Sequence, residues 1–284
     1  MLKAKMTIKS CTLNDLARLL LFESPDSLKV FSMKADEEYG YRKRWKDKKD
    51  HSKGFRVINP PSAKLKKVQR TLLVSLLYLL PTPDYMGGGK GSSVRETMKK
   101  HMHKDMLIHF DINGFFPSVK AFHVYQALRC RGFSKDVAEV ITKLTTFRGH
   151  LPQGAPCSTQ LAKLVVMAPA KNLLNYLKRF GNNVDLTFWV DDIVISGPKA
   201  LEQLTREEVV FDIFSRYGFK LKKEKTKSMD KTLEQEALGV RVDHHRMRQS
   251  STISERISQI IRDYGADSPQ YKGMRRYMKY VTIN

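Results

Sequence analysis

The chain has 284 residues, 41% of them hydrophobic, and its 51 Lys and Arg against 29 Asp and Glu give a net charge of +22. That length allows a buried core and two or three compact subdomains, while the lack of a long apolar run excludes a membrane-spanning protein. The basic residues are spread over many segments, which favours a folded groove that follows a phosphate backbone over a merely soluble basic surface. Three widely spaced cysteines without metal-ligand spacing predict a reducing compartment, which we take to be the cytoplasm.

Two segments of the first third are predicted to be helices that pack the core. Residues 10–33 have leucines at helical spacing, and Pro25 divides them into two short helices, the first capped by Thr12 or Asn14. Residues 64–80 predict one amphipathic helix. Its inward residues are Leu65, Val68, Leu72, Leu73, Leu76 and Leu77, and its outward residues are Lys66, Lys67 and Arg70.

Two further segments carry groups that suit phosphate. Residues 39–61 predict a basic hairpin with its turn at 50–54, and Arg56 just past that turn can fork onto phosphate oxygens; a solvated charged hairpin is the alternative. The glycine-rich run at 87–95 lets backbone N–H groups approach phosphates, and the helix after it would point its positive end there. A flexible loop is the alternative for this run, and its spacing is not that of a P-loop.

Three aspartates end or join predicted strands. Residues 106–111 form an apolar strand that ends in Asp111, and the adjacent Asp191 and Asp192 read as the tight turn of a hairpin over 186–197. Adjacent carboxylates repel one another unless a cation lies between them, although an ordinary acidic turn is the alternative. Two antiparallel strands side by side would bring the three carboxylates together, and two-metal phosphoryl transfer needs such a cluster.

The other segments predict helices and short strands without an internal repeat. Residues 121–147 predict two helices around Gly132-Phe133-Ser134, with Ser134 as a cap, and a Gly-Ala-Pro turn opens a third helix that continues to about Arg179. An amphipathic helix is predicted over 198–217, and Gly218 ends it. A basic strand or loop follows over 219–227, then a short strand over 237–243 and basic helices over 252–264 and 270–281.

Three of these segments, in this order, resemble the motifs of a reverse transcriptase. Phe-Asp111-Ile-Asn-Gly-Phe-Phe-Pro-Ser is similar to the first palm motif, Leu-Pro-Gln-Gly-Ala-Pro-Cys-Ser to the Pro-Gln-Gly motif, and Trp-Val-Asp191-Asp192 to the Tyr-x-Asp-Asp turn. Residues 89–101 also resemble the fingers motif of retron-type enzymes. The resemblance extends from about residue 39 to the C-terminus and is to the bacterial group that includes retron and phage-defence enzymes.

The resemblance implies an α+β fold, the right-hand polymerase with fingers, a ferredoxin-like palm with an antiparallel sheet, and a short helical thumb. The implied parts are N-terminal helices and fingers at 1–104, a palm at 105–235 with fingers and palm helices at 121–180, and a primer-grip strand and short α-helical thumb at 236–284. Leu238 and Gly239 resemble the primer grip. The tail after Ser250 is short for a three-helix thumb, so a partner subunit, an RNA or an oligomer would complete the grip on duplex.

The same resemblance implies a metal site and its chemistry. Asp111, Asp191 and Asp192, together with Ile112, would hold two Mg²⁺ ions, with Mn²⁺ as a substitute. One ion would activate a primer 3′-hydroxyl and the other would steady the leaving pyrophosphate. Lys225 matches a lysine that protonates the pyrophosphate, and a lysine that only faces phosphate is the alternative.

The resemblance also implies a nucleotide site. Phe116, five residues after Asp111, takes the steric-gate position, where a ring crowds a 2′-hydroxyl and favours deoxynucleotides; a core phenylalanine is the alternative. The residues implied at the nucleotide and its template are Arg56 with its companion Lys53, and Ile112, Gly114, Phe115, Phe116, Gln153 and Gly154.

Some residues depart from the family pattern. Trp189 replaces the usual tyrosine or phenylalanine, Gly114 replaces an acidic residue, and Thr159 and Lys163 stand where proline and asparagine are usual. The Val-Thr-Gly signature of retron enzymes is not found, and Glu236-Ala-Leu-Gly stands nearby instead. These departures favour a defence-associated relative outside the retrons.

Together, these features predict an RNA-directed DNA polymerase that acts in anti-phage defence. Its expected partners are a dedicated structured non-coding RNA as template, the RNA/DNA duplex product and deoxynucleoside triphosphates; an effector protein or a homo-oligomer stays open, and a membrane is not expected. The first alternative is a non-catalytic RNA-binding or maturation protein on the same scaffold. The second is a template-independent or protein-primed polymerase, in which a tyrosine or serine hydroxyl starts synthesis.

Overall fold

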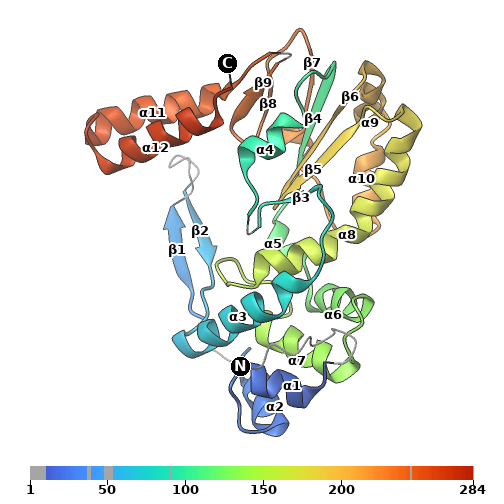
Figure 1. Ribbon diagram of the computed structural model, residues 1–284, viewed down its shortest axis with the longest axis vertical. Coiled ribbons are helices and arrows are strands. Elements are labelled where there is room, and N and C mark those ends of the chain that lie inside the picture. Colours follow the sequence, from blue (N-terminus) through green and yellow to red (C-terminus); the bar gives the residue numbers. More distant parts are fainter. Residues whose placement is uncertain (1–10, 37–39, 48–53, 90, 244, 284) are drawn as a thin grey trace. The chain divides into compact units, whose positions relative to one another are not determined.

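The computed structural model describes residues 11–36, 40–47, 54–89, 91–243 and 245–283 (Figure 1). The chain forms two compact units, the first from residues 1–83 and 114–168 and the second from residues 84–113 and 169–284. The predicted division into fingers, palm and thumb at 105 and 236 stays a prediction.

Helices make up most of the first unit, and their starts follow the predicted caps. Thr12 and Ser24 each accept a hydrogen bond from a backbone N–H in the first turn of their helix, and Pro25 begins the second helix, which confirms the division there. Ser134 caps its helix as predicted. The helices are α1 (Leu13–Leu19), α2 (Pro25–Lys34), α3 (Ala63–Ser75), η3 (Leu77–Leu79), α5 (Phe115–Ser118), α6 (Ala121–Cys130), α7 (Lys135–Thr145) and the first half of α8 (Ser158–Leu177).

The first unit also contains the predicted basic hairpin. β1 (Arg44–Asp47) and β2 (Phe55–Ile58) pair antiparallel, with Trp45 opposite Val57 and Lys46 opposite Arg56. Residues 48–53, which include Lys53 and most of the predicted turn, lie outside the described residues. Because side chains alternate along a strand, these two pairs lie on opposite faces of the hairpin.

A five-stranded sheet is the centre of the second unit. Its strand order is β3-β5-β6-β4-β7, formed by β3 (Met86–Gly87), β4 (Met106–Asp111), β5 (Asp185–Trp189), β6 (Asp192–Gly197) and β7 (Lys227–Asp230). All neighbours pair antiparallel except β3, which runs parallel to β5. The predicted antiparallel palm sheet is confirmed for β4, β5, β6 and β7, and the segment after residue 83 adds a two-residue parallel strand at one edge.

The single continuous helix predicted over 198–217 is wrong, because the structure divides this segment into three shorter helices. The segment forms η5 (Lys199–Glu202), α9 (Gln203–Arg206) and α10 (Val209–Ser215), and Glu208 between them has a left-handed φ of 51°. The buried Leu204 and Val210 are six residues apart, a spacing that does not place them on one face of a continuous helix. The break at Glu208 lets both side chains face the core.

A second, three-stranded sheet corrects the single strand predicted over 237–243. β8 (Gln235–Ala237), β9 (Val240–Val242) and β10 (Met247–Gln249) pair antiparallel, and Leu238 and Gly239 form the turn between the first two. Both turn residues have positive φ, 55° and 79°, which is the pattern of a tight hairpin turn. The sequence did not predict this turn, because residues 237–243 follow the alternating pattern of a strand and only Gly239 is typical of a turn.

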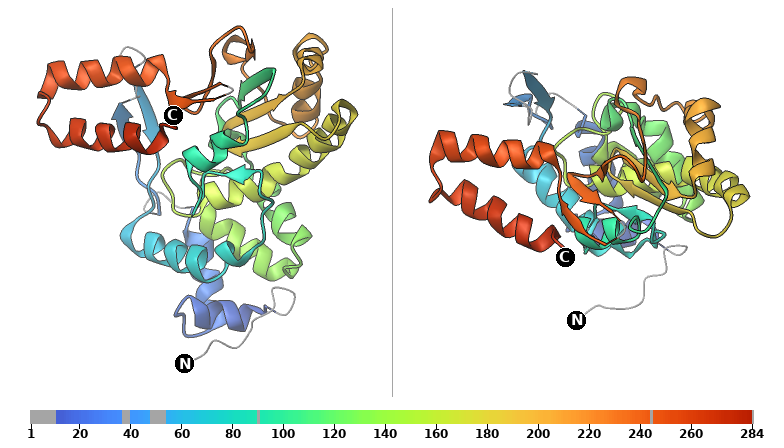
Figure 2. Two further views of the ribbon diagram at one scale, coloured as in Figure 1. Left: turned by 45° about the horizontal axis from the view of Figure 1, so that its top comes forward. Right: turned by 90° about the horizontal axis from the view of Figure 1, so that it is seen from above.

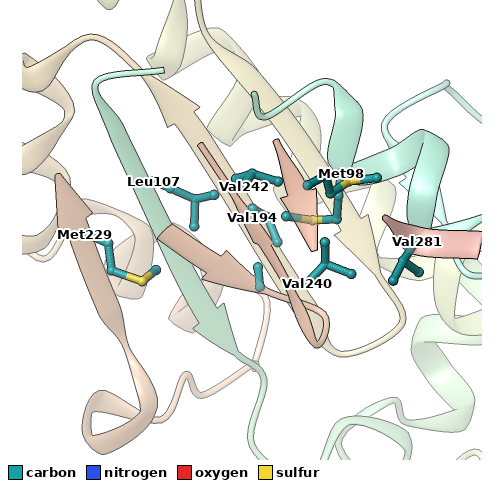
Figure 3. Packing of buried hydrophobic residues seen from close by; sticks show 9 residues of the cluster. Met98, Leu107, Val194, Met229, Val240, Val242 and Val281 are labelled. Carbon is teal, nitrogen blue, oxygen red and sulfur yellow. The ribbon is translucent and has the colours of Figure 1, made fainter. Parts of the chain in front are cut away.

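The two predicted C-terminal helices are confirmed, and one of them joins the core of the second unit. α11 (Ser251–Tyr264) and α12 (Pro269–Val281) lie side by side and antiparallel in both sets of views (Figures 1 and 2). Val281 at the end of α12 packs into a cluster formed by the two sheets and α4 (Val94–Lys99) (Figure 3). Other members of the cluster are Met98, Leu107, Val194, Met229, Val240, Val242 and Met247.

None of the helices in the described part of the chain is long and apolar enough to cross a bilayer.

A buried histidine joins two neighbouring strands of the large sheet, β5 and β6. The ring nitrogens of His101 lie 2.8 Å from Ser196 Oγ on β6 and 2.9 Å from Thr187 Oγ1 on β5. Burial, and then the charges of Lys104 and Lys100, outweigh Asp185 and lower the pKa of His101 to about 4. The folded protein therefore holds this ring neutral at the pH values where the unfolded chain begins to protonate it.

We expect this histidine to make the protein less stable in acid. The stabilisation is complete above the unfolded pKa of 6.5 and is lost as the pH falls toward the folded value. Between neutral pH and pH 5 the free energy of unfolding should fall by about 2 kcal/mol through this group alone. Urea unfolding of wild type and His101→Gln at both pH values measures it; an equal pH dependence in the two proteins would contradict the assignment.

Candidate active site

A strained turn carries two of the predicted aspartates. Trp189 pairs with Asp192 across β5 and β6, so the turn consists of Val190 and Asp191. The predicted Asp191-Asp192 turn is therefore wrong by one residue, because Asp192 already belongs to β6. Val190 has a φ of 60°, a costly conformation for a β-branched side chain. Strain of this kind persists only where the surroundings impose it, and it clusters at functional sites.

Two glycines of the run at 87–95 pack against this turn. A Cβ at Gly87 would lie 2.6 Å from Trp189 Cε3, and a Cβ at Gly88 would lie 2.9 Å from Val190 Cγ2. β3 also pairs with β5 at this point, Gly87 opposite Trp189. At these two positions the glycines are required by close packing on the turn rather than by the approach of a phosphate.

The structure brings the three predicted aspartates together. Asp111 lies directly opposite Asp192 in the antiparallel pairing of β4 and β6, which puts both side chains on one face of the sheet. The backbone N–H of Ile112 donates to the carbonyl of Asp191 over 2.9 Å. The end of β4 and the turn are thus fixed to each other by backbone hydrogen bonds.

Two lysines contact Asp111. Lys222 Nζ lies 2.5 Å from Oδ1 and Lys225 Nζ lies 3.1 Å from Oδ2. Ile112 forms a β-bridge with Leu221, and the N–H of Lys222 donates to the carbonyl of Asp111, so backbone pairing aligns the basic run with the strand end. Burial alone would lower the pKa of Lys225, but the hydrogen bond to Asp111 and its negative charge raise it overall.

A histidine that the sequence did not single out contacts another member of the trio. His109 Nε2 lies 2.7 Å from Asp192 Oδ1. His109 is two residues before Asp111 on β4 and therefore on the same face of the sheet, diagonal to Asp192. The alternation along the strand was the available signal, but it required knowing that β6 is the neighbour of β4.

The charge around Asp191 suits a divalent cation. Burial, followed by the charges of Asp192 and then Asp111, raises the pKa of Asp191 above its ordinary value. Carboxylate oxygens are the ligands that Mg²⁺ prefers, and a cation would relieve this repulsion. No three His, Cys, Asp or Glu side chains of the described residues converge as a preformed metal site. Instead, the lysines and His109 engage the carboxylates of Asp111 and Asp192.

The first unit contains a basic cavity of about 470 Å³. Four cations line it, two from the hairpin and two from α3, and the loop before α8 forms another wall. The lining residues are Lys46, Arg56, Ile58, Lys66, Arg70, Phe116, Gln153, Gly154, Ala155, Pro156, Ser158 and Thr159. Lys66 and Arg70 were predicted on the outward face of their helix, and that face contributes them to the lining of this cavity.

Backbone contacts fix two walls of this cavity to each other. The N–H of Asn59 at the end of the hairpin donates to the carbonyl of Gln153 over 2.8 Å. Gly154 has a φ of 98°, a conformation that favours glycine. The Nε of Arg56 is buried without a hydrogen-bond partner. Since a buried guanidinium nitrogen left unpaired is costly, this atom suits an anionic ligand in the cavity.

The structure does not gather all the predicted nucleotide residues in this cavity. Arg56, Phe116, Gln153 and Gly154 line it, whereas Lys53 lies outside the described residues. The side chains of Phe115 and Ile112 are buried. Gly114 is left-handed, with a φ of 54° and nothing within 4 Å of a Cβ placed there, which accounts for a glycine where the family often has an acidic residue. The roles of Leu238 and Gly239 stay predictions.

Comparisons with known proteins agree with this geometry. Residues 46–242 match the model of the reverse transcriptase (RNA-dependent DNA polymerase) family. The retron Ec86 reverse transcriptase of Escherichia coli is 28% identical over 204 residues, covering 72% of this chain and 62% of that protein. The retron Se72 reverse transcriptase of Salmonella heidelberg is 29% identical over 189 residues, covering 65% and 49%. The chain thus spans about half to three fifths of the length of these curated relatives.

Solved structures give the fold. Candida albicans telomerase in complex with a fragment of telomeric RNA matches with a TM-score of 0.55 at 10% identity, covering 78% of this chain and 50% of that one. A truncated Candida tropicalis telomerase matches with the same score at 12% identity, covering 75% and 55%. At such low identity the likeness shows the fold alone, and it confirms the α+β right-hand polymerase. With more than half of its length matched by the family model, the chain belongs to the reverse transcriptase family of RNA-dependent DNA polymerases.

Proposed function

We propose that this protein is an RNA-directed DNA polymerase and that Asp111, Asp191 and Asp192 are its catalytic carboxylates. The observation that carries the proposal is the register of β4 and β6, which sets Asp111 opposite Asp192. The backbone hydrogen bond from the N–H of Ile112 to the carbonyl of Asp191 supports the proposal, since it fixes the third aspartate next to the end of β4. A protein that only binds RNA needs none of these three side chains at one place.

These carboxylates, with the carbonyl of Ile112, would hold two Mg²⁺ ions, and Mn²⁺ would substitute. Bound divalent ions supply charge to phosphoryl oxygens and lower the pKa of an attacking hydroxyl. Lys222 and Lys225 then lose Asp111 as their partner and are free to contact the phosphates of the nucleotide. A lysine without a carboxylate partner is still protonated at neutral pH, so Lys225 would donate a proton to the leaving pyrophosphate.

The basic cavity of the first unit would take the deoxynucleoside triphosphate. Its four cations, Lys46, Arg56, Lys66 and Arg70, match the charge of a triphosphate. Arg56 has an unpaired buried nitrogen for one phosphate oxygen. Gln153 and Gly154, from the loop before α8, would line the base and template side.

A primer-extension assay tests the proposal. The purified protein is given a labelled primer on an RNA template, the four deoxynucleotides and Mg²⁺ or Mn²⁺. We expect extension whose sequence follows the template and which stops when the metal is chelated. RNA binding without any incorporation would favour the non-catalytic RNA-binding protein, and untemplated product or product covalently attached to protein would favour the template-independent or protein-primed polymerase.

We further propose that the natural template is a dedicated structured RNA and that the activity serves anti-phage defence. Both curated relatives named above are retron enzymes, and the net charge of +22 suits a large RNA partner. Whether the chain stands inside or outside the retrons stays a prediction, as do an effector protein and a homo-oligomer. Sequencing the RNA and DNA that copurify from native cells tests the template, and a random mixture of cellular RNAs would contradict it.

Replacing the proposed steric gate is expected to relax sugar selection. Phe116 lines the cavity, and Phe116→Ala should raise the use of ribonucleotides relative to deoxynucleotides by about ten- to hundredfold, the range in which apolar pockets reject an added hydroxyl. The measurement is kcat/KM for each nucleotide in single-nucleotide extension. Phe122→Ala, at an exposed phenylalanine that does not line the cavity, is the control. Unchanged discrimination in Phe116→Ala would remove the gate role.

A further inference from the structure

His109 stands at the boundary between the buried core of the second unit and its carboxylates. On β4, the side chains of Leu107, His109 and Asp111 lie on one face of the large sheet, because side chains alternate along a strand. Leu107 belongs to the apolar cluster of Figure 3, and so does Val194, which pairs directly opposite His109 on β6. A half-buried imidazole at this place in an otherwise apolar strand calls for a polar partner.

That partner is one oxygen of Asp192. Nε2 of His109 lies 2.7 Å from Oδ1 of Asp192. Because an ionised carboxylate only accepts hydrogen bonds, the N–H of the imidazole is the donor. A carboxylate has two oxygens with about four acceptor sites, so this bond fixes the orientation of the group through Oδ1 while Oδ2 can face a cation.

The contact of His109 differs from those of the two lysines on Asp111. Lys222 and Lys225 have long flexible side chains whose charge a bound cation repels, and Lys225 is 53% exposed, so both can withdraw. His109 has a short side chain that is 17% exposed. It is carried by β4, which pairs with β6 on one side and β7 on the other. An imidazole also donates a hydrogen bond without carrying a charge, so its bond to Asp192 can persist beside a metal ion.

We propose that His109 is a positioning residue that holds the carboxylate of Asp192 in the orientation a divalent ion requires. The inference rests on the proposed function, since it takes Asp192 to be a metal ligand. A group that hydrogen-bonds a ligand from outside the coordination sphere orients that ligand before the metal binds, and its loss costs about 10–100-fold in metal affinity or activity. The expected effect of losing this imidazole is therefore weaker metal binding.

Binding of Mn²⁺ alone to the full chain tests this role without polymerisation. Electron paramagnetic resonance of the free ion measures the affinity in the absence of nucleotide and RNA. His109→Gln places an amide N–H near the position of Nε2 and should keep the affinity within about threefold of wild type. His109→Asn carries the same amide on a shorter side chain that does not reach Oδ1, and it should bind Mn²⁺ about tenfold more weakly or worse. Thermal unfolding checks that both variants fold.

A double-mutant cycle shows whether the effect passes through Asp192. In the background of Asp192→Ala, His109→Asn should lower the Mn²⁺ affinity no further, because the carboxylate that the imidazole orients is gone. Additive losses would overturn the proposal, and so would equal affinities in His109→Asn and His109→Gln. Tighter binding in His109→Asn than in wild type would also overturn it, since the imidazole would then compete with the metal for Asp192.

Primer extension and one further variant separate this role from the polymerase itself. His109→Asn should raise the Mg²⁺ concentration for half-maximal extension by about tenfold and leave the nucleotide KM at saturating Mg²⁺ within about twofold. An unchanged Mg²⁺ requirement would contradict the positioning role and leave the polymerase standing. Wild-type Mn²⁺ affinity in Asp191→Asn with Asp192→Asn would overturn both proposals, whereas lost affinity there with none lost in His109→Asn would overturn the role of His109 alone.

Discussion

Asp191→Asn combined with Asp192→Asn is expected to abolish templated extension while RNA binding is kept. The change leaves the size of both side chains the same and removes the charge that a divalent ion needs. Metal-assisted charge stabilisation is worth several kcal/mol, so the rate should fall by about a thousandfold or more. Single-turnover extension at saturating nucleotide measures the rate, and anisotropy with labelled RNA measures binding.

The chain offers a matched control for this double change. Glu207 and Glu208 are also adjacent acidic residues, exposed in the break between α9 and α10. Glu207→Gln with Glu208→Gln changes the net charge by the same amount, and we expect near wild-type extension. If the asparagine variant extends at the rate of this control, Asp191 and Asp192 are not metal ligands.

Gly87→Ala is expected to disturb the Val190-Asp191 turn from the strand beside it. The new methyl group would lie 2.6 Å from Trp189 Cε3, a separation at which the indole ring or β3 must move. Overpacking of this kind costs about 1–3 kcal/mol, and each kcal/mol lowers the Tm by about 2–4 °C in a chain of this size. Because Trp189 adjoins the strained Val190, kcat should fall by about tenfold or more, with little change in nucleotide KM.

A second substitution distinguishes crowding of the indole from a general loss of folding. Trp189→Phe introduces a smaller ring, one usual in the family, so Gly87→Ala should cost less in that background than in wild type. Gly273→Ala on α12 has nothing within 4 Å of its new Cβ and should stabilise the protein by about 1 kcal/mol. Equal losses from Gly87→Ala in both backgrounds would show that Trp189 is not the residue it crowds.

The three aspartates were predictable because their signals are local. Asp111 ends a continuous apolar strand, and Asp191 and Asp192 interrupt two such runs, so the pattern places them without knowledge of the fold. Their convergence needed one further step, the pairing of β4 with β6, which the sequence allowed but did not require. The shift of the turn to Val190-Asp191 was not predictable, since a valine at positive φ contradicts local preference.

The other contacts of the site depend on tertiary pairing. Lys222 and Lys225 stand in a run of similar lysines, and only the bridge from Leu221 to Ile112 determines which of them contact Asp111. Gly87 reads as a loop residue until β3 is seen beside Trp189. Lys66 reads as a solvated helix residue until the cavity beside α3 is seen. The sequence pattern predicts which residues form the polar face of a helix, but not which other segments of the chain contact that face.

The central claim, that three carboxylates from distant segments hold divalent ions together, is open to direct mapping. Fe²⁺ is bound in place of Mg²⁺, and ascorbate with peroxide then cleaves the backbone next to the metal. We expect cuts near residue 111 and near residues 191–192 of the same chain, which excess Mg²⁺ suppresses and Asp191→Asn with Asp192→Asn removes. Cuts confined to other segments, or unchanged in that variant, would contradict the account.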